Sequence, residues 1–321
     1  MPASRPQGRI FPLLCLLGAV VFWGTSFVAL KTALDSFSPM TVIWLRMALA
    51  TVVFAPVWFF IPKPAYQRGD ALWLALIALL QPCLYYLAEG YAVRLTTSSA
   101  AGVISAIVPL LVAAGAWIFL RKHLSIRSGI AIGVSLVGVA LLSMGGQAQS
   151  SAPNPALGNV LEVMAMACAA GSMIAIKHVS RRYNPWFLTG LQAAVGLVFF
   201  LPGAIASGPA SWVDASRAGW ISVAYLGTFV SLGAFGLYNT AVTHMPANRA
   251  ALAINLVPAV ALLSGWLVRG ETLSPAQLVA CAIIVGAVVL SETGSGAEDL
   301  AEEPDAITRV AEAVLDAEWS A

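Results

Sequence analysis

Two ionisable side chains, Arg46 and Glu89, stand inside stretches of sequence that are otherwise apolar. A guanidinium recognises a carboxylate through paired hydrogen bonds, and a carboxylate binds an ammonium group or accepts a proton. Arg46 could therefore bind a carboxylate, and Glu89 an ammonium group or a coupling proton. The alternative is structural. If both segments are helices, both residues lie on the order of 5 to 10 Å below the same surface and could meet as an ion pair, or Arg46 could bind a helix-end carbonyl.

Prolines inside the apolar stretches could free backbone carbonyls to act as hydrogen-bond acceptors. Pro109 and Pro258 each fall at the middle of an apolar stretch, where a proline frees the carbonyl four residues back, at Ser105 and Ile254. Pro82 also falls at the middle of its stretch. We expect the three prolines to break or hinge their helices, with kinks that serve packing alone as the alternative. The neutral side chains that could join such a site are Ser26, Gln81, Asn239 and Asn255.

Aromatic side chains near the middle of these stretches could wall a pocket for an apolar or aromatic group. The candidates are Trp23, Trp44, Tyr85, Tyr86 and Tyr238. For Trp23, packing against lipid or another helix is the alternative. The candidate residues together predict a small, partly charged binding site lined by aromatic rings.

The stretches that hold these residues have the length and composition of membrane spans. Of the 321 residues, 59% are hydrophobic and 10% are charged, against roughly 25% charged in an ordinary soluble domain. A helix of about 20 residues crosses the roughly 30 Å of hydrocarbon in a bilayer. We predict an all-α integral membrane protein with ten transmembrane helices, at residues 10–32, 39–60, 71–93, 98–120, 127–144, 157–179, 185–205, 217–241, 247–268 and 275–291.

Basic residues set the predicted orientation. With the N-terminus inside, eleven Lys and Arg residues of the loops fall on the cytoplasmic side and four on the other, which is the bias that cytoplasmic loops carry. We therefore place the chain in the plasma (inner) membrane as a multi-pass protein with both termini cytoplasmic. Residues 1–9 form the N-terminal segment, and the acidic tail 292–321 is expected to be disordered.

The first five predicted spans can be laid over the second five. Trp23–Lys31 lies over Ala169–Lys177, and Ala92–Ser125 lies over Ala241–Ser274. An odd number of spans in each half makes the two halves enter the membrane from opposite sides, so we predict two inverted five-helix repeats. The predicted boundaries are 10–144 for the first repeat, 145–156 for the linker and 157–291 for the second repeat.

Two further features concern packing and the surface. Gly129-x-x-x-Gly133 is a spacing that lets helices approach closely, and packing within the fold is its expected role, with dimerisation as the alternative. Lys31 and Lys177 lie at equivalent ends of related helices. We expect their side chains to reach the two opposite surfaces of the membrane.

Several short motifs occur in order along the chain. They are Trp23-Gly24-x-Ser26 followed by Lys31, Arg46, Ala92–Ala100 leading to Pro109, Ala241–Pro258, and Gly270-Glu271-x-Leu273-Ser274. In this order they resemble the EamA family of the drug/metabolite transporter superfamily, over about Leu14 to Leu290. The resemblance implies a ten-helix carrier that exports amino acids or related metabolites. The chain departs from the family with Arg121-Lys122 in place of Gly-Glu, with Gln192 where the repeat would place an arginine, and with the unusual charge of Glu89.

We therefore expect a carrier that works by alternating access through a midplane cavity between the repeats. A nucleotide sugar or a cationic drug is the alternative cargo, and a membrane-embedded enzyme or a channel is the alternative class. The sequence contains no HExxH, GxSxG or Gly-rich phosphate loop, so we expect neither catalysis nor a metal or cofactor. The expected partners are a small-molecule substrate, optionally a coupling proton, and the lipid bilayer, with no nucleic acid. A monomer or a weak homodimer is the expected working unit.

Overall fold

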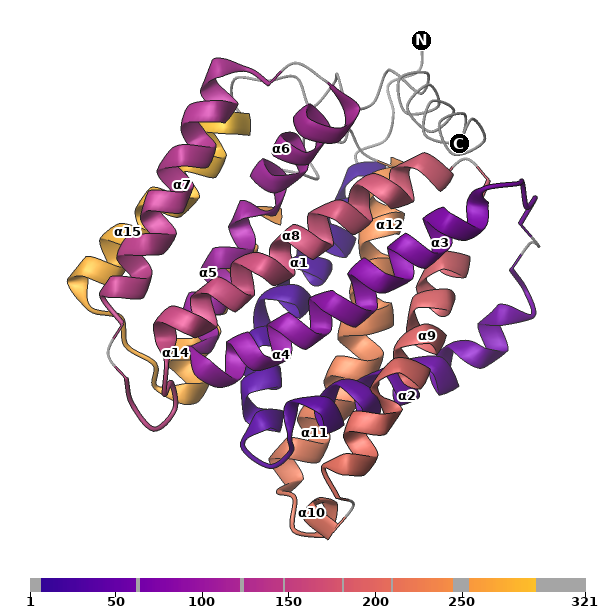
Figure 1. The fold of residues 1–321 in the computed structure, drawn as a ribbon, viewed down its shortest axis with the longest axis horizontal. Coiled ribbons are helices and arrows are strands. Elements are labelled where there is room, and N and C mark those ends of the chain that lie inside the picture. The colour runs from indigo at the N-terminus through magenta and orange to yellow at the C-terminus, as the bar shows by residue number, and fades with distance from the viewer. Residues whose placement is uncertain are drawn as a thin grey trace, which may run out of the picture.

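The protein is all-helical in the computed structural model shown in Figure 1, which describes residues 7–61, 64–121, 124–146, 148–180, 182–208, 210–244 and 254–292. No strand occurs in these ranges beyond an isolated bridge between Gln149 and Ala152. Most of the predicted N-terminal segment and tail, and residues 247–253 of the ninth predicted span, lie outside the described residues.

Eight helical segments of the described residues are long and apolar enough to cross a membrane, and two shorter apolar helices follow them. The long segments are α1 (Gln7–Leu34), α2 (Pro39–Trp58), α3 (Asp70–Ala78) with α4 (Tyr85–Leu95), α5 (Ser98–Ile104) with α6 (Val108–Leu120), α7 (Ile126–Met144), α8 (Pro155–Val179), α9 (Pro185–Ala206), and α11 (Arg217–Tyr225) with α12 (Phe235–His244). The shorter helices are α14 (Val257–Arg269) and α15 (Pro275–Glu292), and α10 (Ala210–Val213) is a single turn. The all-helical, multi-pass architecture is confirmed.

Several helices begin with a capping side chain followed by a proline. The side chain of Ser38 accepts from the amide of Thr41 at the start of α2, and Asn154 and Asn184 cap α8 and α9 in the same way. Proline then occupies the first turn of each helix, where its missing N–H costs no hydrogen bond. The predicted spans 39–60, 157–179 and 185–205 begin within two residues of these helix starts.

Three of the long segments are interrupted. A π-helical stretch, η1 (Leu79–Leu84), separates α3 from α4, and a 3₁₀ turn, η2 (Ser105–Ile107), separates α5 from α6. The first contains Pro82 and the second directly precedes the first turn of α6, which holds Pro109, as the prolines predicted. The carbonyl of Ser105 is not free as expected, because it accepts from the amide of Val108. A third interruption, η3 (Leu226–Ala234), contains no proline, and the sequence did not predict it.

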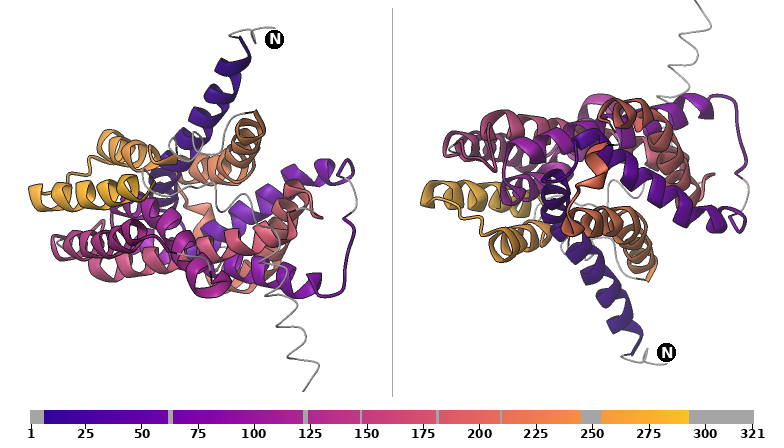
Figure 2. Two further views of the ribbon diagram at one scale, coloured as in Figure 1. Left: turned by 90° about the horizontal axis from the view of Figure 1, so that it is seen from above. Right: turned by 90° about the horizontal axis from the view of Figure 1, so that it is seen from below.

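The two halves of the chain pack through each other. Helix α1 packs against α14, α12 and η3 of the second half, and α8 packs against α4 and α6 of the first half. Helix α2 lies against α9, and α7 lies along α15 at one side of the bundle, as Figure 2 shows. The interior therefore forms between the halves rather than within either of them.

The loops gather at two ends of the bundle. At the end called here the linker end, the amide of Asn154 donates to the carbonyl of Leu95 at 3.1 Å, and Arg269 pairs with Asp35 at 2.7 Å. The other end, called here the N-terminal end, holds the start of α1 and the residues around Arg182 (Figure 1). A membrane chain whose helices alternate in direction must sort its loops in this way.

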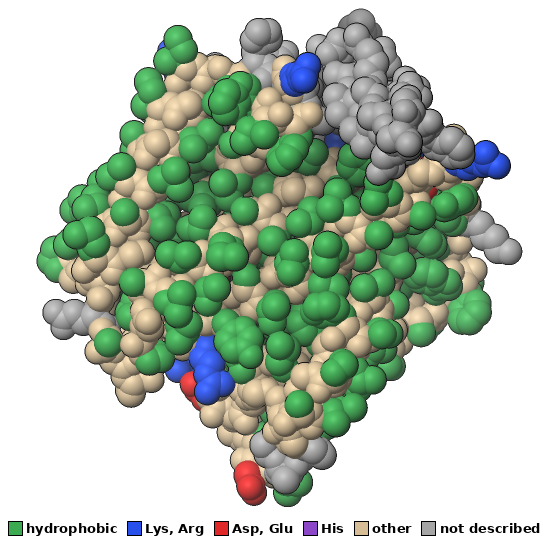
Figure 3. All heavy atoms as spheres, in the orientation of Figure 1, with side chains coloured by type: hydrophobic (Ala, Val, Ile, Leu, Met, Phe, Trp, Pro, Cys, Tyr) green, Lys and Arg blue, Asp and Glu red, His purple; other side chains and the backbone are tan. Residues whose placement is uncertain are grey.

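Apolar side chains cover the outside of the bundle. Large hydrophobic residues with more than half of their surface exposed occur on α2, α7, α9, α14 and α15. On the face in Figure 3, the few charged side chains lie toward the two ends rather than across the middle. In water such a surface would be an extended exposed apolar patch, whereas in a bilayer it is the surface that faces lipid.

Close backbone contact between the halves depends on glycine. A Cβ added at Gly102 on α5 would lie 2.2 Å from Cβ of Ala261 on α14, and one added at Gly24 on α1 would lie 2.5 Å from Cβ of Val260. By contrast, a Cβ at Gly133 would meet nothing within 4 Å, and one at Gly129 only the tip of a leucine. The expectation that Gly129 and Gly133 serve close packing within the fold is wrong, because this side of α7 faces outward.

We expect Gly102→Ala to lower the free energy of unfolding by about 1 to 3 kcal/mol, because the added methyl group overfills the contact with α14. Thermal unfolding of the detergent-solubilised protein, followed by circular dichroism, measures the effect. Gly133→Ala is the matched control and should leave the midpoint unchanged or slightly raised. Equal midpoints for the two variants would contradict the packing described for α5 and α14.

Candidate functional site

Arg46 and Glu89 face each other inside the bundle. Nη1 of Arg46 on α2 lies 3.8 Å from Oε2 of Glu89 on α4, and the two residues are 6% and 5% exposed. The separation is longer than a hydrogen bond, so the charges attract each other without the bidentate geometry of a tight Arg–carboxylate pair. The ion pair that the sequence suggested is confirmed.

Other side chains complete the surroundings of the two charges. Nε of Arg46 donates to Oγ of Ser231 in η3 at 2.9 Å, and its guanidinium carbon lies 4.4 Å from the ring centre of Tyr86, within cation–π range. Tyr85 donates its hydroxyl to Oε1 of Glu89 at 2.6 Å. Two predicted site residues on α4 thus contact Arg46, a third binds Glu89, and Ser231 connects the arginine to the second half.

A third buried charge, Glu162 on α8, was missed by the sequence analysis. Its side chain has no exposed surface, and neither carboxylate oxygen has a hydrogen-bond partner among the described residues. Its carboxylate lies within electrostatic range of Glu89 and of the hydroxyl of Tyr85. The signal was present, because Glu162 is an ionisable residue inside the predicted span 157–179, which is the criterion that selected Arg46.

The three charges lie at one level of the bundle. Arg46 and Glu162 each follow the start of their helix by seven residues, and Glu89 precedes the end of α4 by six. At 1.5 Å per residue, each lies roughly 10 Å from the linker end. One cation and two acids therefore share a water-poor layer between the halves.

The predicted aromatic residues fall into two groups. Trp44 packs with Tyr86 in one apolar cluster, and its ring stacks on that of Trp212 at 5.8 Å between centroids. Trp23 instead contacts Tyr238 at 5.4 Å between centroids, across α1 and α12. The first group adjoins the ion pair, and the second joins the first half to the second.

The three prolines lie where the structure interrupts or begins a helix. Pro82 is buried in η1, next to Gln81, whose backbone dihedral angles leave the helical region. The carbonyl of Gln81 accepts from Nε2 of Gln192 on α9 at 2.8 Å. Pro109 and Pro258 occupy the first turns of α6 and α14. Gln192 therefore binds backbone that the interruption of α3 and α4 leaves available.

The remaining neutral candidates are less informative. Oγ of Ser26 donates to the carbonyl of Trp23 within its own helix, at 2.6 Å. Asn255 is half-buried just before α14, and Asn239 belongs to α12 with its side chain outside the described residues. Their assignment to a binding site stays a prediction.

The expectation that the side chain of Lys31 reaches the surface is wrong. It is 3% exposed, and its ammonium group donates to the backbone carbonyls of Val93, Arg94 and Thr96. These carbonyls lie at the C-terminal end of α4, where unpaired acceptors and the helix dipole favour a cation. Burial of Lys31 is therefore stabilised by the helix end that it caps.

Glu271 caps the start of α5, the helix that follows α4 along the chain. Its Oε1 accepts from the amide and hydroxyl of Ser98, and its Oε2 accepts from those of Ser99, all at 2.7 to 3.0 Å. These groups begin α5, where an anion is favoured. Residues 96–99, called here the capped turn, are thus held between Lys31 and Glu271, whose charges attract each other. The sequence singled out Glu271 as a motif residue without a role.

The counterparts of these residues under the repeat differ, where the structure describes them. Arg121 stands where the second half has Gly270, and both have left-handed backbone, with φ of 50° and 63°. Glycine adopts this conformation without strain and arginine does so at a cost. Lys177, the counterpart of Lys31, is exposed. The buried lysine that caps a helix end at the linker end is therefore not repeated at Lys177.

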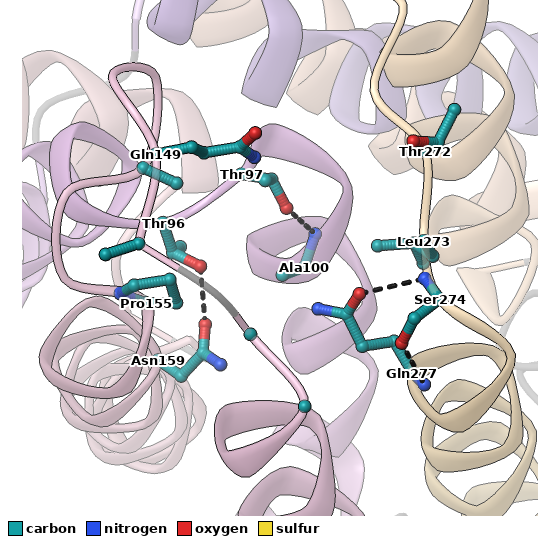
Figure 4. A pocket seen from close by; sticks show the side chains of 14 residues that line it. Thr96, Thr97, Ala100, Gln149, Pro155, Asn159, Thr272, Leu273, Ser274 and Gln277 are labelled. Carbon is teal, nitrogen blue, oxygen red and sulfur yellow. Dashed lines mark hydrogen bonds between the residues drawn. The ribbon is translucent and has the colours of Figure 1, made fainter.

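A pocket of about 400 Å³ opens beside the capped turn, as Figure 4 shows. The hydroxyl of Thr96 donates to Oδ1 of the buried Asn159 at 2.8 Å, and across the pocket the amide of Ser274 donates to Gln277 at 3.0 Å. None of the residues that line it carries a charge: Thr96, Thr97, Ala100, Gly145, Gly146, Ala148, Gln149, Ala152, Pro155, Asn159, Thr272, Leu273, Ser274 and Gln277. The linker end thus offers a neutral, hydrogen-bonding recess.

An ion pair joins the halves at the N-terminal end. Asp70 accepts from Arg182 at 2.6 Å, from the hydroxyl of Tyr183 at 3.0 Å and from the amide of Gln67 at 2.9 Å. Burial and the hydrogen bond to Asp70 raise the pKa of Tyr183 to about 12. This cluster connects the start of α3 to the turn between α8 and α9.

Comparison with known proteins gives consistent matches along the chain. The EamA-like transporter family matches residues 10–144 and 156–293. "Uncharacterized transporter YetK" of Bacillus subtilis is 24% identical over 282 residues, covering 86% of this chain and 85% of that protein. "Uncharacterized inner membrane transporter YedA" of Escherichia coli is 28% identical over 301 residues, covering 89% and 93%.

A solved structure titled "Crystal structure of protein" shares the fold. It superposes with a TM-score of 0.52 at 17% identity, covering 90% of this chain and 97% of that one. At this identity the likeness concerns the fold alone.

We expect Glu271→Ala to lower the free energy of unfolding by at least about 2 kcal/mol, because it removes a charged acceptor from two amides and two hydroxyls of the capped turn. Unfolding in a denaturing detergent, followed by circular dichroism, measures the loss. Thr272→Ala removes a neighbouring exposed side chain and should have little effect. A Glu271→Ala variant as stable as this control would show that the capped turn does not depend on the carboxylate.

We expect the free energy of unfolding to fall between pH about 10, the ordinary pKa of tyrosine, and pH about 12, and we expect part of this fall to depend on Tyr183. In that window the hydroxyl ionises in the unfolded chain but not in the folded protein, so rising pH favours unfolding. Melting temperatures of the wild type and Tyr183→Phe across this range test it. Below pH about 10 the wild type should have the higher melting temperature, and the difference should shrink as the pH rises through this range. A constant difference would contradict the assignment.

Proposed function

This chain belongs to the EamA-like transporter family and is a multi-pass membrane transporter, and we propose that it exports amino acids or closely related metabolites. The buried pair of Arg46 and Glu89 carries the proposal. An amino acid presents a carboxylate and an ammonium group on neighbouring atoms, and the pair offers the complementary charge for each. A cargo with only one of these charges would leave one member of the pair unmatched.

The geometry of the pair favours exchange with a cargo. The two charges are 3.8 Å apart and lack a direct hydrogen bond, and each keeps neutral partners, Ser231 and Tyr86 for Arg46 and Tyr85 for Glu89. Both groups are already out of water. A zwitterion whose carboxylate binds Arg46 and whose ammonium group binds Glu89 therefore adds little desolvation cost on the protein side. Trp44 and Tyr86 would border the cargo's side chain.

We further propose ten transmembrane helices in two inverted repeats. The support lies in a repeated contact: Arg46 on α2 binds Ser231 in η3, and Gln192 on α9 binds the carbonyl of Gln81 in η1. The second long helix of each half thus reaches the interruption of the third segment of the other half. Two exchanged copies of one fold would produce this reciprocity.

Alternating access would then move one repeat against the other about the helix interruptions at Pro82, Pro109 and Pro258. We place the N-terminal end and both termini in the cytoplasm and the linker end outside, in the plasma (inner) membrane. Cargo would leave past the capped turn, and the neutral pocket beside it would be the exit vestibule. The cargo alternatives, a nucleotide sugar and a cationic drug, remain outcomes of the following test.

We expect proteoliposomes of the wild type, loaded in turn with radiolabelled amino acids, to release at least one of them faster than protein-free vesicles. Arg46→Ala and Glu89→Gln should slow that release by more than about tenfold, since removing one partner of a buried charge pair costs about 2 to 5 kcal/mol. Rapid filtration measures the rates.

Arg217→Ala, which removes an exposed arginine at the linker end, is the matched control and should keep the wild-type rate. If folded wild type releases no amino acid, the cargo proposal fails, and nucleotide sugars and lipophilic cations become the next panel. Release by Arg46→Ala at the wild-type rate would remove Arg46 from the site. Loss in Glu89→Gln alone, with a lipophilic cation as cargo, would favour the cationic alternative.

A further inference from the structure

Glu162 is the one side chain in the charged layer whose charge has no visible compensation among the described residues. It is fully buried, and both carboxylate oxygens lack a hydrogen-bond donor there. A polar group removed from water normally finds a partner, and an ionised carboxylate without one is strongly disfavoured. A proton or a bound cation would remove this unpaired charge.

The charges of the layer do not balance when every group is ionised. Arg46 is the cation, and Glu89 and Glu162 are the acids. Nε of Arg46 donates to Ser231, and its guanidinium forms an ion pair with Glu89. The hydroxyl of Tyr85 donates a hydrogen bond to Glu89. The layer therefore carries one uncompensated negative charge, and it falls on Glu162.

No other described group compensates for Glu162. Helix α8 packs against α3, α4, α5, α6 and α7 and against η1 and η2. The titratable groups from these elements that interact with Glu162 are Glu89 and Tyr85, both on α4. Glu89 carries the same charge, and Lys31 is occupied by the capped turn. A proton is the smallest cation that fits a closed site of this kind.

We propose that Glu162 binds a proton that the transporter exchanges for its cargo, an inference that rests on the proposed function. In the conformation described here, one carboxyl oxygen of Glu162 carries the proton, and the layer is neutral. When the site opens to water, the O–H bond breaks, the electron pair stays on oxygen and the proton passes to water. The resulting carboxylate restores a negative charge beside Glu89, which favours the ammonium group of an incoming cargo.

Infrared spectroscopy tests the bound proton without any cargo. In nanodiscs at neutral pH, the wild type should show the carbonyl stretching band of a buried protonated carboxyl group. Glu162→Gln should remove that band, Glu162→Asp should shift it, and Asp214→Asn, which removes an exposed carboxylate, should leave it unchanged. Absence of the band in wild type, or its persistence in Glu162→Gln, would overturn the proposal. Glutamine matches protonated glutamate in shape, so the variant should fold, and circular dichroism verifies this.

Flux measurements test the exchange. For an amino acid that the wild type releases, an inward-directed proton gradient should accelerate release about tenfold or more, and Glu162→Gln should lose this acceleration while Asp214→Asn keeps it. A gradient response retained by folded Glu162→Gln would overturn the proposal. If the wild type moves no amino acid, the cargo proposal fails on its own, and the infrared band still decides whether Glu162 binds a proton.

Discussion

Exclusion of water is the constraint on which the rest of this structure depends. In the hydrocarbon layer, every charge and every backbone group must find its partner inside the protein. Lys31 and Glu271 satisfy the two helix ends of the capped turn, and Arg46 and Glu89 satisfy each other. Among the described buried ionisable side chains, Glu162 is the one whose charged atoms all lack a partner, and the same constraint makes it a candidate for chemistry.

Helix interruptions supply the polar contacts between the halves. Each interruption displaces backbone from the regular ladder, and a displaced carbonyl needs a donor. Gln192 donates to the carbonyl of Gln81 in η1, and in η3 the hydroxyl of Ser231 donates to the carbonyl of Leu226 while accepting from Arg46. The interruptions thus place polar groups deep in an apolar bundle, at the contacts between the halves.

The two ends of the bundle are built differently. At the linker end, a cation caps one helix and an anion the next, so the turn between them is fixed from both sides. Among the counterparts at the N-terminal end, Lys177 is exposed and Arg121 stands at the left-handed position that Gly270 holds at the linker end. The contacts that hold the linker end therefore differ from those of the described residues at the N-terminal end.

The sequence alone determined the membrane class, the approximate positions of the long helical segments, and the depth of Arg46 and Glu89, because hydropathy and the rise per residue act along the chain. It also contained Glu162, which the same depth criterion would have selected. Only the tertiary structure decided which side of each helix faces inward. Helices that are apolar on all sides carry little signal of rotation, so the burial of Lys31 and the outward position of Gly133 had to come from contacts between distant segments.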